Sequence, residues 1–269
     1  ILVVDDEKYN RKLITSILKK YSAAFSEAEN GIRALEELNK KNYDIILMDV
    51  RMPEMNGLEA VKEIRKLEKR IKSETPVIVL TAAITREDQL EYEKDGMNGF
   101  LSKPFSEKDL INSISDIFYM HDTGIESINR KIKNNSMYTD DSIIRKFSLK
   151  TLEDISNGDN IFLKEMLTTL IESTKEGMDG ILNSLHKNEL ETLGEYAHKI
   201  SSPCLHVNAI ELNHLLKEIE NNCRKNENPD AIPRLVSQAL EESALLLRWA
   251  ENEIKKLNHN KEQILTNSK

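Results

Sequence analysis

Cysteine and long apolar runs are both scarce in this sequence. The two cysteines, Cys204 and Cys223, are too few for a disulfide framework, and their spacing is not that of metal ligands. The longest strongly apolar stretch, residues 77–84, is far shorter than the ~20 residues that a membrane helix needs. We therefore expect a reducing, cytoplasmic setting, no signal peptide and no membrane contact in this segment.

Positive charge is also in deficit. The sequence has 38 Lys and Arg residues against 46 Asp and Glu residues, which gives a formal net charge of -8. We expect no nucleic-acid partner, because nonspecific binding depends on Lys and Arg neutralising phosphates. The 269 residues suffice for about two domains. Because the chain opens directly on a strand-like segment without an initiator methionine, we expect it to be part of a longer protein.

The stretch at residues 43–53 organises the first half of the chain. A compact apolar run ends on Asp49, and turn signals follow at Pro53, Asn56 and Gly57. Such a run is typical of a buried strand in a parallel sheet. A carboxylate at the carboxyl end of that strand lies where open α/β sheets bind their ligands. We predict that Asp49 accepts a phosphoryl group, since aspartyl phosphates are established covalent intermediates.

Five predicted strands alternate with five predicted helices over residues 1–120. The strands are expected at residues 1–4, 23–28, 43–49, 77–80 and 99–102, and the helices at 9–21, 31–38, 58–67, from a capping box at 85–88 onward, and at 106–120. This alternation predicts an α/β flavodoxin-like, doubly wound, five-stranded parallel sheet. A strand order of 2-1-3-4-5 would bring the ends of strands one and three together.

Polar residues stand at the ends of four of these strands. They are Asp5 and Asp6 after the first, Asp49 on the third, Thr81 on the fourth and Lys103 after the fifth. Convergent carboxylates repel one another unless a cation joins them, and their oxygens favour Mg²⁺. Lys103 would offer an ammonium and Thr81 a hydroxyl to the transferred oxygens. A lone Asp at a strand end is usually a cap or turn residue, but this coincidence favours one joint site.

These segments resemble the signature of response-regulator receiver domains over residues 1–120. The stretches are Val-Val-Asp-Asp-Glu at 3–7, Leu-Met-Asp-Val-Arg-Met-Pro-Glu-Met-Asn-Gly at 47–57, Leu-Thr-Ala at 80–82 and Leu-Ser-Lys-Pro at 101–104. The resemblance implies a Mg²⁺ site formed by Asp6, Asp49, the backbone carbonyl of Arg51 and, in an assisting role, Asp5.

The same resemblance implies a conformational switch formed by Thr81 and Phe100, and a cis peptide bond between Lys103 and Pro104. Phe100 is expected to report the state of the site by changing its burial. It stands where the family often has Tyr, so a version of the switch based on a hydroxyl group is excluded.

The second half of the chain has no strand signal. Residues 121–141 are polar and predict a linker, in part helical. Apolar residues then recur at helical spacing over residues 161–185, 190–204, 210–219 and 235–257. We predict an all-α four-helix bundle at 142–258, with an extra helical turn or two at 148–155 and a tail at 259–269.

His198 is the notable residue of this bundle. It lies one position past the apolar stripe, which predicts an imidazole at the edge of the buried face or outside it. An exposed imidazole is largely neutral at pH 7 and nucleophilic at nitrogen. Taken alone, His198 would be an ordinary surface histidine. The remaining histidines are interpreted as structural or solvated, and they are His121, His186, His206, His214 and His259.

The segment around His198 resembles a histidine-containing phosphotransfer (HPt) domain over residues 142–257. The stretches are Glu-Tyr-Ala-His-Lys-Ile-Ser-Ser-Pro at 195–203, Asn-Ala at 208–209 and Leu-Leu-Lys-Glu-Ile-Glu at 215–220. The resemblance implies that His198 accepts a phosphoryl group. Many family members carry Lys and Gly three and four residues after the histidine, where this chain has Ser201 and Ser202. Either Lys199 substitutes for that lysine or the transfer is slower.

Together the two halves predict a phosphorelay module of the kind found at the carboxyl-terminal end of a hybrid sensor histidine kinase. An upstream histidine kinase would phosphorylate Asp49, and His198 would pass the phosphoryl group to a downstream response regulator. The module would then lie in the cytoplasm, either free or beneath a membrane-anchored sensor. It is not a complete kinase, since it shows no kinase ATP-binding motif. The alternative is a receiver whose phosphorylation controls docking by an inert helical domain.

Overall fold

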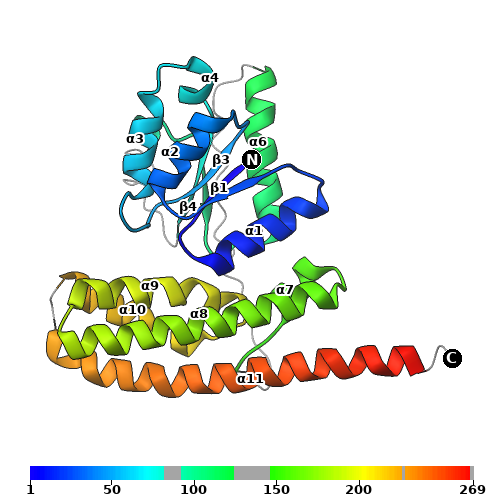
Figure 1. Cartoon of the computed structure of the whole chain (residues 1–269), viewed down its shortest axis with the longest axis vertical. Helices are drawn as coiled ribbons and strands as arrows, with labels where there is room; N and C mark the ends of the chain where they lie inside the picture. The colour runs from blue at the N-terminus through cyan, green and yellow to red at the C-terminus, as the bar shows by residue number, and fades with distance from the viewer. Residues whose placement is uncertain (82–91, 124–145, 226–227, 267–269) are drawn as a thin grey trace.

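The computed structural model describes residues 1–81, 92–123, 146–225 and 228–266. These residues form two units, an α/β unit up to residue 123 and a helical unit from residue 146, stacked one above the other in Figure 1. The predicted fold of each unit is confirmed, and their contact is described below.

The α/β unit is built on five parallel strands. They are β1 (Leu2–Val4), β2 (Ser26–Ala28), β3 (Ile46–Asp49), β4 (Val77–Thr81) and β5 (Gly99–Ser102). Their order is β2-β1-β3-β4-β5, as the sequence predicted, and Val4 of β1 lies beside Met48 of β3. The carboxyl ends of β1 and β3 are therefore neighbours.

Helices cover both faces of this sheet (Figure 1). They are α1 (Lys8–Lys20), α2 (Gly31–Lys40), α3 (Gly57–Arg65), the short α4 (Arg70–Ser73) and α6 (Glu107–Thr123). Alternate strand residues face opposite sides, so Val3 packs in a core with α1 and α6, whereas Leu2 and Val4 pack with α2 and α3. The first residues of the helix predicted from residue 85 lie outside the described residues, and residues 92–94 are helical. The short α4 was not predicted, and α6 extends past residue 120.

The helical unit is a bundle of four long helices preceded by a short one. The helices are α7 (Lys150–Ser156), α8 (Asn160–Lys187), α9 (Leu190–His206), α10 (Ile210–Lys225) and α11 (Ile232–Thr266), with a 3₁₀ turn at Pro229–Ala231 before α11. Asp159 caps α8 by accepting hydrogen bonds from the backbone N–H groups of Ile161 and Phe162. Asn188, in the left-handed region at φ 57°, ends it.

Two boundaries differ from the sequence prediction. The helix α11 continues to Thr266, so its backbone runs through most of the segment predicted as a tail. The first residues of the predicted linker belong to α6, and those from 124 to 141 lie outside the described residues. Within the described part of the chain, no helix combines the length and apolar character required to cross a bilayer.

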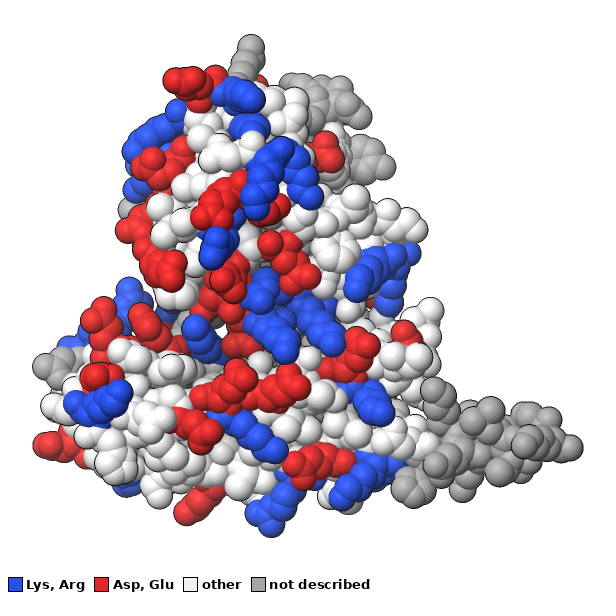
Figure 2. Space-filling view, in the orientation of Figure 1, with Lys and Arg blue, Asp and Glu red and all other residues white. Residues whose placement is uncertain are grey.

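The α/β unit rests on the helical unit through α1, which lies over α8 and α9 (Figure 1). Lys8 and Lys12 of α1 form ion pairs with Glu172 and Glu165 of α8, each with an N···O distance of 3.1 Å. In the space-filling view, basic and acidic side chains meet along this junction (Figure 2). The junction places the carboxyl ends of the strands against α9.

Candidate functional site

A cluster of three carboxylates lies at the carboxyl edge of the sheet. Asp5 and Asp6 follow β1, and Asp49 is the last residue of β3. One carboxylate oxygen from each lies within 4.8 Å of the others. The register of β1 against β3 brings them together, as the strand order predicted.

Lys103 bridges two of these carboxylates. It follows β5 and is joined to Pro104 by a cis peptide bond, as the resemblance implied. Its Nζ lies 2.7 Å from Asp5 Oδ2 and 3.1 Å from Asp49 Oδ1. Burial alone would lower the pKa of Lys103, but the charges of Asp49 and Asp5 raise it above its usual range, so it stays a cation. Burial raises the pKa of Asp49 to about 7 despite the attraction of Lys103.

The donor set at this edge fits a small, hard divalent cation. Carboxylate oxygens are the ligands that Mg²⁺ prefers, and the three meet within reach of one ion. The pKa of Asp6 is raised by burial and, to a smaller extent, by the charge of Asp5, so a bound cation would favour its ionised form. Asp5 is further fixed by hydrogen bonds from the Glu7 backbone N–H (2.9 Å) and from Asn10 Nδ2 (3.2 Å).

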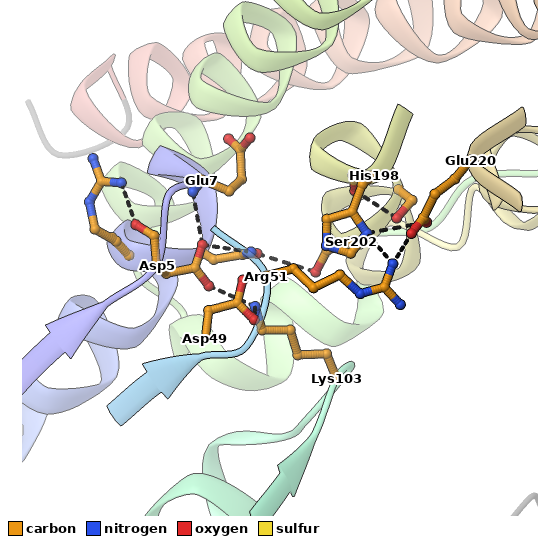
Figure 3. A network of polar contacts seen from close by, with 11 residues as sticks. Asp5, Glu7, Asp49, Arg51, Lys103, His198, Ser202 and Glu220 are labelled. Atoms are coloured by element: carbon orange, nitrogen blue, oxygen red, sulfur yellow. Dashed lines mark hydrogen bonds and ion pairs between the residues drawn. The ribbon is translucent and has the colours of Figure 1, made fainter. Parts of the chain in front are cut away.

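His198 of α9 faces this cluster from the helical unit (Figure 3). Its Nδ1 lies 3.2 Å from Glu220 Oε2 on α10. The guanidinium of Arg51, which follows β3, donates to Glu220 and lies 3.5 Å from the same Nδ1. Since Glu220 can only accept a hydrogen bond when ionised, we assign the proton of the neutral ring to Nδ1. The lone pair of Nε2 is then free to react.

The surroundings of His198 determine the exposure and the pKa of its imidazole. The side chain is 23% exposed, so it lies at the edge of the buried face, one of the two positions that the helix pattern allowed, and the α/β unit covers it in place of solvent. Burial lowers the pKa of His198 to about 3, with further contributions from the positive charges of Arg51 and Lys103. The ring is therefore neutral at pH 7, with its nitrogen lone pair unprotonated.

A cavity of about 30 Å³ lies between the two units and is lined by both Asp49 and His198. At ~10–15 Å³ for each water, this volume holds two or three waters. Its lining brings together most of the predicted site residues, namely Asp6, Asp49, Arg51, Thr81, Lys103, His198, Lys199, Ser201 and Ser202. Phe100 is not among them, since it packs on Tyr92 with ring centroids 6.1 Å apart.

The residues after His198 contact different partners. Lys199 reaches across the junction to Asp6, with an Nζ···Oδ2 distance of 3.0 Å. The Ser201 hydroxyl donates to the backbone carbonyl of His198 at 2.8 Å, and the Ser202 hydroxyl donates to Asn10 Oδ1 at 3.4 Å. Lys199 is thus directed to the carboxylate cluster, and Ser201 is directed to its own helix.

Several residues of the site were not predicted from the sequence. They are Asn10, the side chain of Arg51, Asn213, Lys217 and Glu220. Three of them stand on α10 at positions 213, 217 and 220, a spacing that places them on one face of a helix. The polar face could have indicated these site residues. The sequence analysis used only the apolar stripe of the same helix.

Comparison with known protein families gives a match for each half of the chain. Residues 1–115 match the family model of the response regulator receiver domain, and residues 165–255 match that of the Hpt domain. The two resemblances found in the sequence are confirmed.

Similar proteins include histidine kinases from plants and a slime mould. Probable histidine kinase 6 of Oryza sativa subsp. japonica is 36% identical over 132 residues, and hybrid signal transduction histidine kinase B of Dictyostelium discoideum is 39% identical over 120 residues. These matches cover 43% and 41% of this chain but only 14% and 6% of those proteins. The chain therefore spans a small part of the length of these relatives.

Among solved structures, the receiver domain of a sensor histidine kinase from Pseudomonas aeruginosa PAO1 has magnesium coordinated in its active site cleft. It shares 32% sequence identity, and the match covers 43% of this chain and 93% of that one with a TM-score of 0.40.

Proposed function

Since this chain combines a response regulator receiver domain with an Hpt domain, we propose that it is a phosphorelay module of a two-component system. Asp49 accepts a phosphoryl group from the phosphohistidine of a histidine kinase and passes it to His198. His198 then donates it to the aspartate of a downstream response regulator. The observation that carries this proposal is the cavity between the two units that Asp49 and His198 both line.

The transfer between the two residues needs no additional reactant. The Nε2 lone pair of His198 attacks phosphorus, the bond between phosphorus and the Asp49 carboxylate oxygen breaks, and its electron pair stays on that carboxylate. The proton on Nδ1 stays in place, so the phosphorylated ring is an imidazolium. The carboxylate of Glu220, 3.2 Å from Nδ1, stabilises that positive charge.

The residues of the α/β unit stabilise negative charge on the phosphoryl oxygens. Lys103 lies between Asp5 and Asp49, where its ammonium can bind an oxygen of the acyl phosphate. Asp6, Asp49 and the backbone carbonyl of Arg51 would hold Mg²⁺, with Asp5 assisting, and the bound ion would neutralise charge on the transferring group. Thr81 lines the same cavity and would offer its hydroxyl.

We propose a histidine kinase upstream and a response regulator downstream, because the relatives include hybrid histidine kinases. The kinase would be supplied by a longer form of this polypeptide or by a separate protein, and the module would work in the cytoplasm. The docked units further support transfer between Asp49 and His198 of one chain. The roles of Thr81 and Phe100 as a switch remain predictions.

Transfer of radiolabelled phosphate from a phosphorylated kinase core tests the relay in three chains, which are the unaltered protein, Asp49→Asn and His198→Gln. We expect base-stable, acid-labile label in the unaltered protein and none in either variant. If His198→Gln carries as much label as the unaltered chain, all of it base-labile, His198 is inert and the helical domain serves docking only. Mixing the two variants tests transfer within one chain, since such a mixture should form phosphohistidine far more slowly than the unaltered protein.

A further inference from the structure

Four basic side chains line the cavity between Asp49 and His198, and three of them already have a carboxylate partner. Lys103 bridges Asp5 and Asp49, Lys199 pairs with Asp6, and Arg51 pairs with Glu220. The fourth is Lys217, for which no ion pair is found among the described residues. Its charge is therefore available to an anion that enters the cavity.

The position of Lys217 follows from the two residues that flank it on α10. Asn213 Nδ2 donates to the backbone carbonyl of Ser201 on α9 at 2.6 Å. Glu220 accepts a hydrogen bond from His198, which is also on α9. Residues 213, 217 and 220 are spaced four and three apart, so they lie along one face of α10. Lys217 is thus held on the face of α10 that packs against the reactive turn of α9.

We propose that the Lys217 ammonium binds a phosphoryl oxygen during transfer to His198 and in the phosphohistidine that results. This inference rests on the proposed function. The phosphoryl group carries roughly two negative charges. Ser201 stands on α9 where many family members carry Lys, and it supplies no positive charge to balance them. The sequence suggested Lys199 as the compensating cation, but Lys199 is committed to Asp6 while the units are docked. Lys217 supplies the charge from the neighbouring helix, and it stays with His198 when the α/β unit leaves.

The test compares the rate and yield of phosphohistidine in full-length chains, with a phosphorylated kinase core as donor. The chains are the unaltered protein, Lys217→Gln, Lys217→Arg and Lys150→Gln. Lys150 is exposed on α7, does not line the cavity, and controls for the loss of one positive charge. We expect Lys217→Gln to form phosphohistidine roughly tenfold more slowly, since a hydrogen bond to a charged group is lost. Lys217→Arg should restore the rate to within about threefold, because guanidinium also binds phosphate oxygens.

The base-labile acyl phosphate on Asp49 should form equally in all four chains when each also carries His198→Gln, which prevents its onward transfer. An unchanged rate in Lys217→Gln, with Lys150→Gln also normal, overturns this inference and leaves the relay intact. Failure of Lys217→Arg to restore the rate also overturns it, because the role would then not be one of charge. Absence of phosphohistidine from the unaltered protein overturns the relay and this inference together. A normal unfolding midpoint, followed through Trp249 in the helical unit, excludes misfolding of the variants.

Discussion

At the scale of single residues, His206 is an unusual component of the junction between the two units. It is buried on α9 against Tyr9 of α1, with ring centroids 5.6 Å apart. Neither ring nitrogen of His206, nor the hydroxyl of Tyr9, has a hydrogen-bond partner within the described structure. Burial lowers the pKa of His206 to about 4, and the positive charge of Lys103 lowers it further. The nearby backbone carbonyl of Ser202 has a smaller, raising effect on this pKa, although its geometry is not that of a hydrogen bond.

This burial makes the stability of the helical unit depend on pH. The unfolded chain protonates His206 below its ordinary pKa of 6.5, whereas the folded chain does so only near 4. The unfolded state therefore binds more protons between these values, and stability falls as the pH falls from 6.5 to 4, by about 3 kcal/mol in total. Asp49, Asp6 and Glu7 have raised pKa values in the folded state, so they bind protons more readily there and increase stability as the pH falls.

Replacing His206 by Phe isolates the contribution of His206 to the pH dependence of stability, because the other titratable groups contribute equally in both proteins. We expect the free energy of unfolding of His206→Phe, relative to that of the unaltered protein, to rise by about 3 kcal/mol when the pH is lowered from 7 to 4. Urea unfolding followed by fluorescence measures it, since Trp249 is the single tryptophan and packs on Phe147 in the helical unit. Parallel stability curves for the two proteins would contradict the assignment.

The residues that the sequence identified and those that it missed differ in how they are positioned. Asp6, Asp49 and Lys103 follow predicted strands, and parallel topology alone brings such ends together. Glu220 and Lys217 are charged residues on a helix, where a solvent-exposed face is the ordinary interpretation. Their approach to His198 depends on the packing of α10 against α9, which no local pattern encodes.

At the scale of elements, the turn from β3 into α3 depends on the absence of a side chain at Gly57. A Cβ atom at this position would lie 2.1 Å from the backbone oxygen of Asp49 and 3.1 Å from Met48 Cγ. The Gly57 backbone N–H donates to Val50 at 2.9 Å, which ties the start of α3 to the residue after Asp49. The position of the predicted phosphoacceptor is thus coupled to this close contact.

We expect Gly57→Ala to displace the end of β3, because a backbone atom cannot yield as a flexible side chain can. The change should cost the α/β unit about 1–3 kcal/mol and lower the yield of acyl phosphate on Asp49 in a His198→Gln background. Gly99→Ala is the matched control, since its Cβ would lie 3.4 Å from Ile78 Cγ1, an ordinary contact. Equal yields and stabilities for the two variants would show that Gly57 is not needed for this geometry.

Most elements were predictable because their apolar periodicity is local. The strands and their order followed from short buried runs between turn signals, and the bundle followed from stripes at helical spacing. The short α4 at Arg70–Ser73 carries no such stripe. The end of α11 was also misjudged, because the regular apolar spacing that predicted this helix ends at Leu257 while its backbone stays helical to Thr266.

At the scale of the whole molecule, the α/β unit covers the face of the helical unit that carries His198. Glu7 accepts a hydrogen bond from Ser173 at 2.8 Å, and Asn10 accepts one from Ser202, so the contact extends from the cavity along α1. Under the proposed relay, the receiver of a downstream regulator would have to reach the same imidazole. It can do so only after the attached α/β unit has moved away, so docking within the chain and donation to a partner exclude each other.

The ion pairs between α1 and α8 should therefore control the transfer from Asp49 to His198. Lys8 and Lys12 pair with Glu172 and Glu165, and their partly exposed side chains limit each pair to ~0–1 kcal/mol. Reversing both acidic residues, as Glu165→Lys with Glu172→Lys, replaces two attractions by two repulsions. We expect transfer from Asp49 to His198 to slow by roughly tenfold, and added salt should reduce the difference because it screens exposed charges.

Adding the complementary changes Lys8→Glu and Lys12→Glu to the same chain should restore the rate to within about threefold, because the pairs then re-form with opposite polarity. The control reverses Glu36 and Glu63 to Lys, which pair within the α/β unit with Arg33 and Lys66 and do not reach the helical unit. Quench-flow measurement of phosphohistidine in single turnovers gives each rate. A reversed chain that transfers as fast as the unaltered one would mean that these contacts do not hold the units together during transfer. The docked arrangement would then be stabilised by the ion pairs that line the cavity, Lys199–Asp6 and Arg51–Glu220, and by the buried Tyr9–His206 contact.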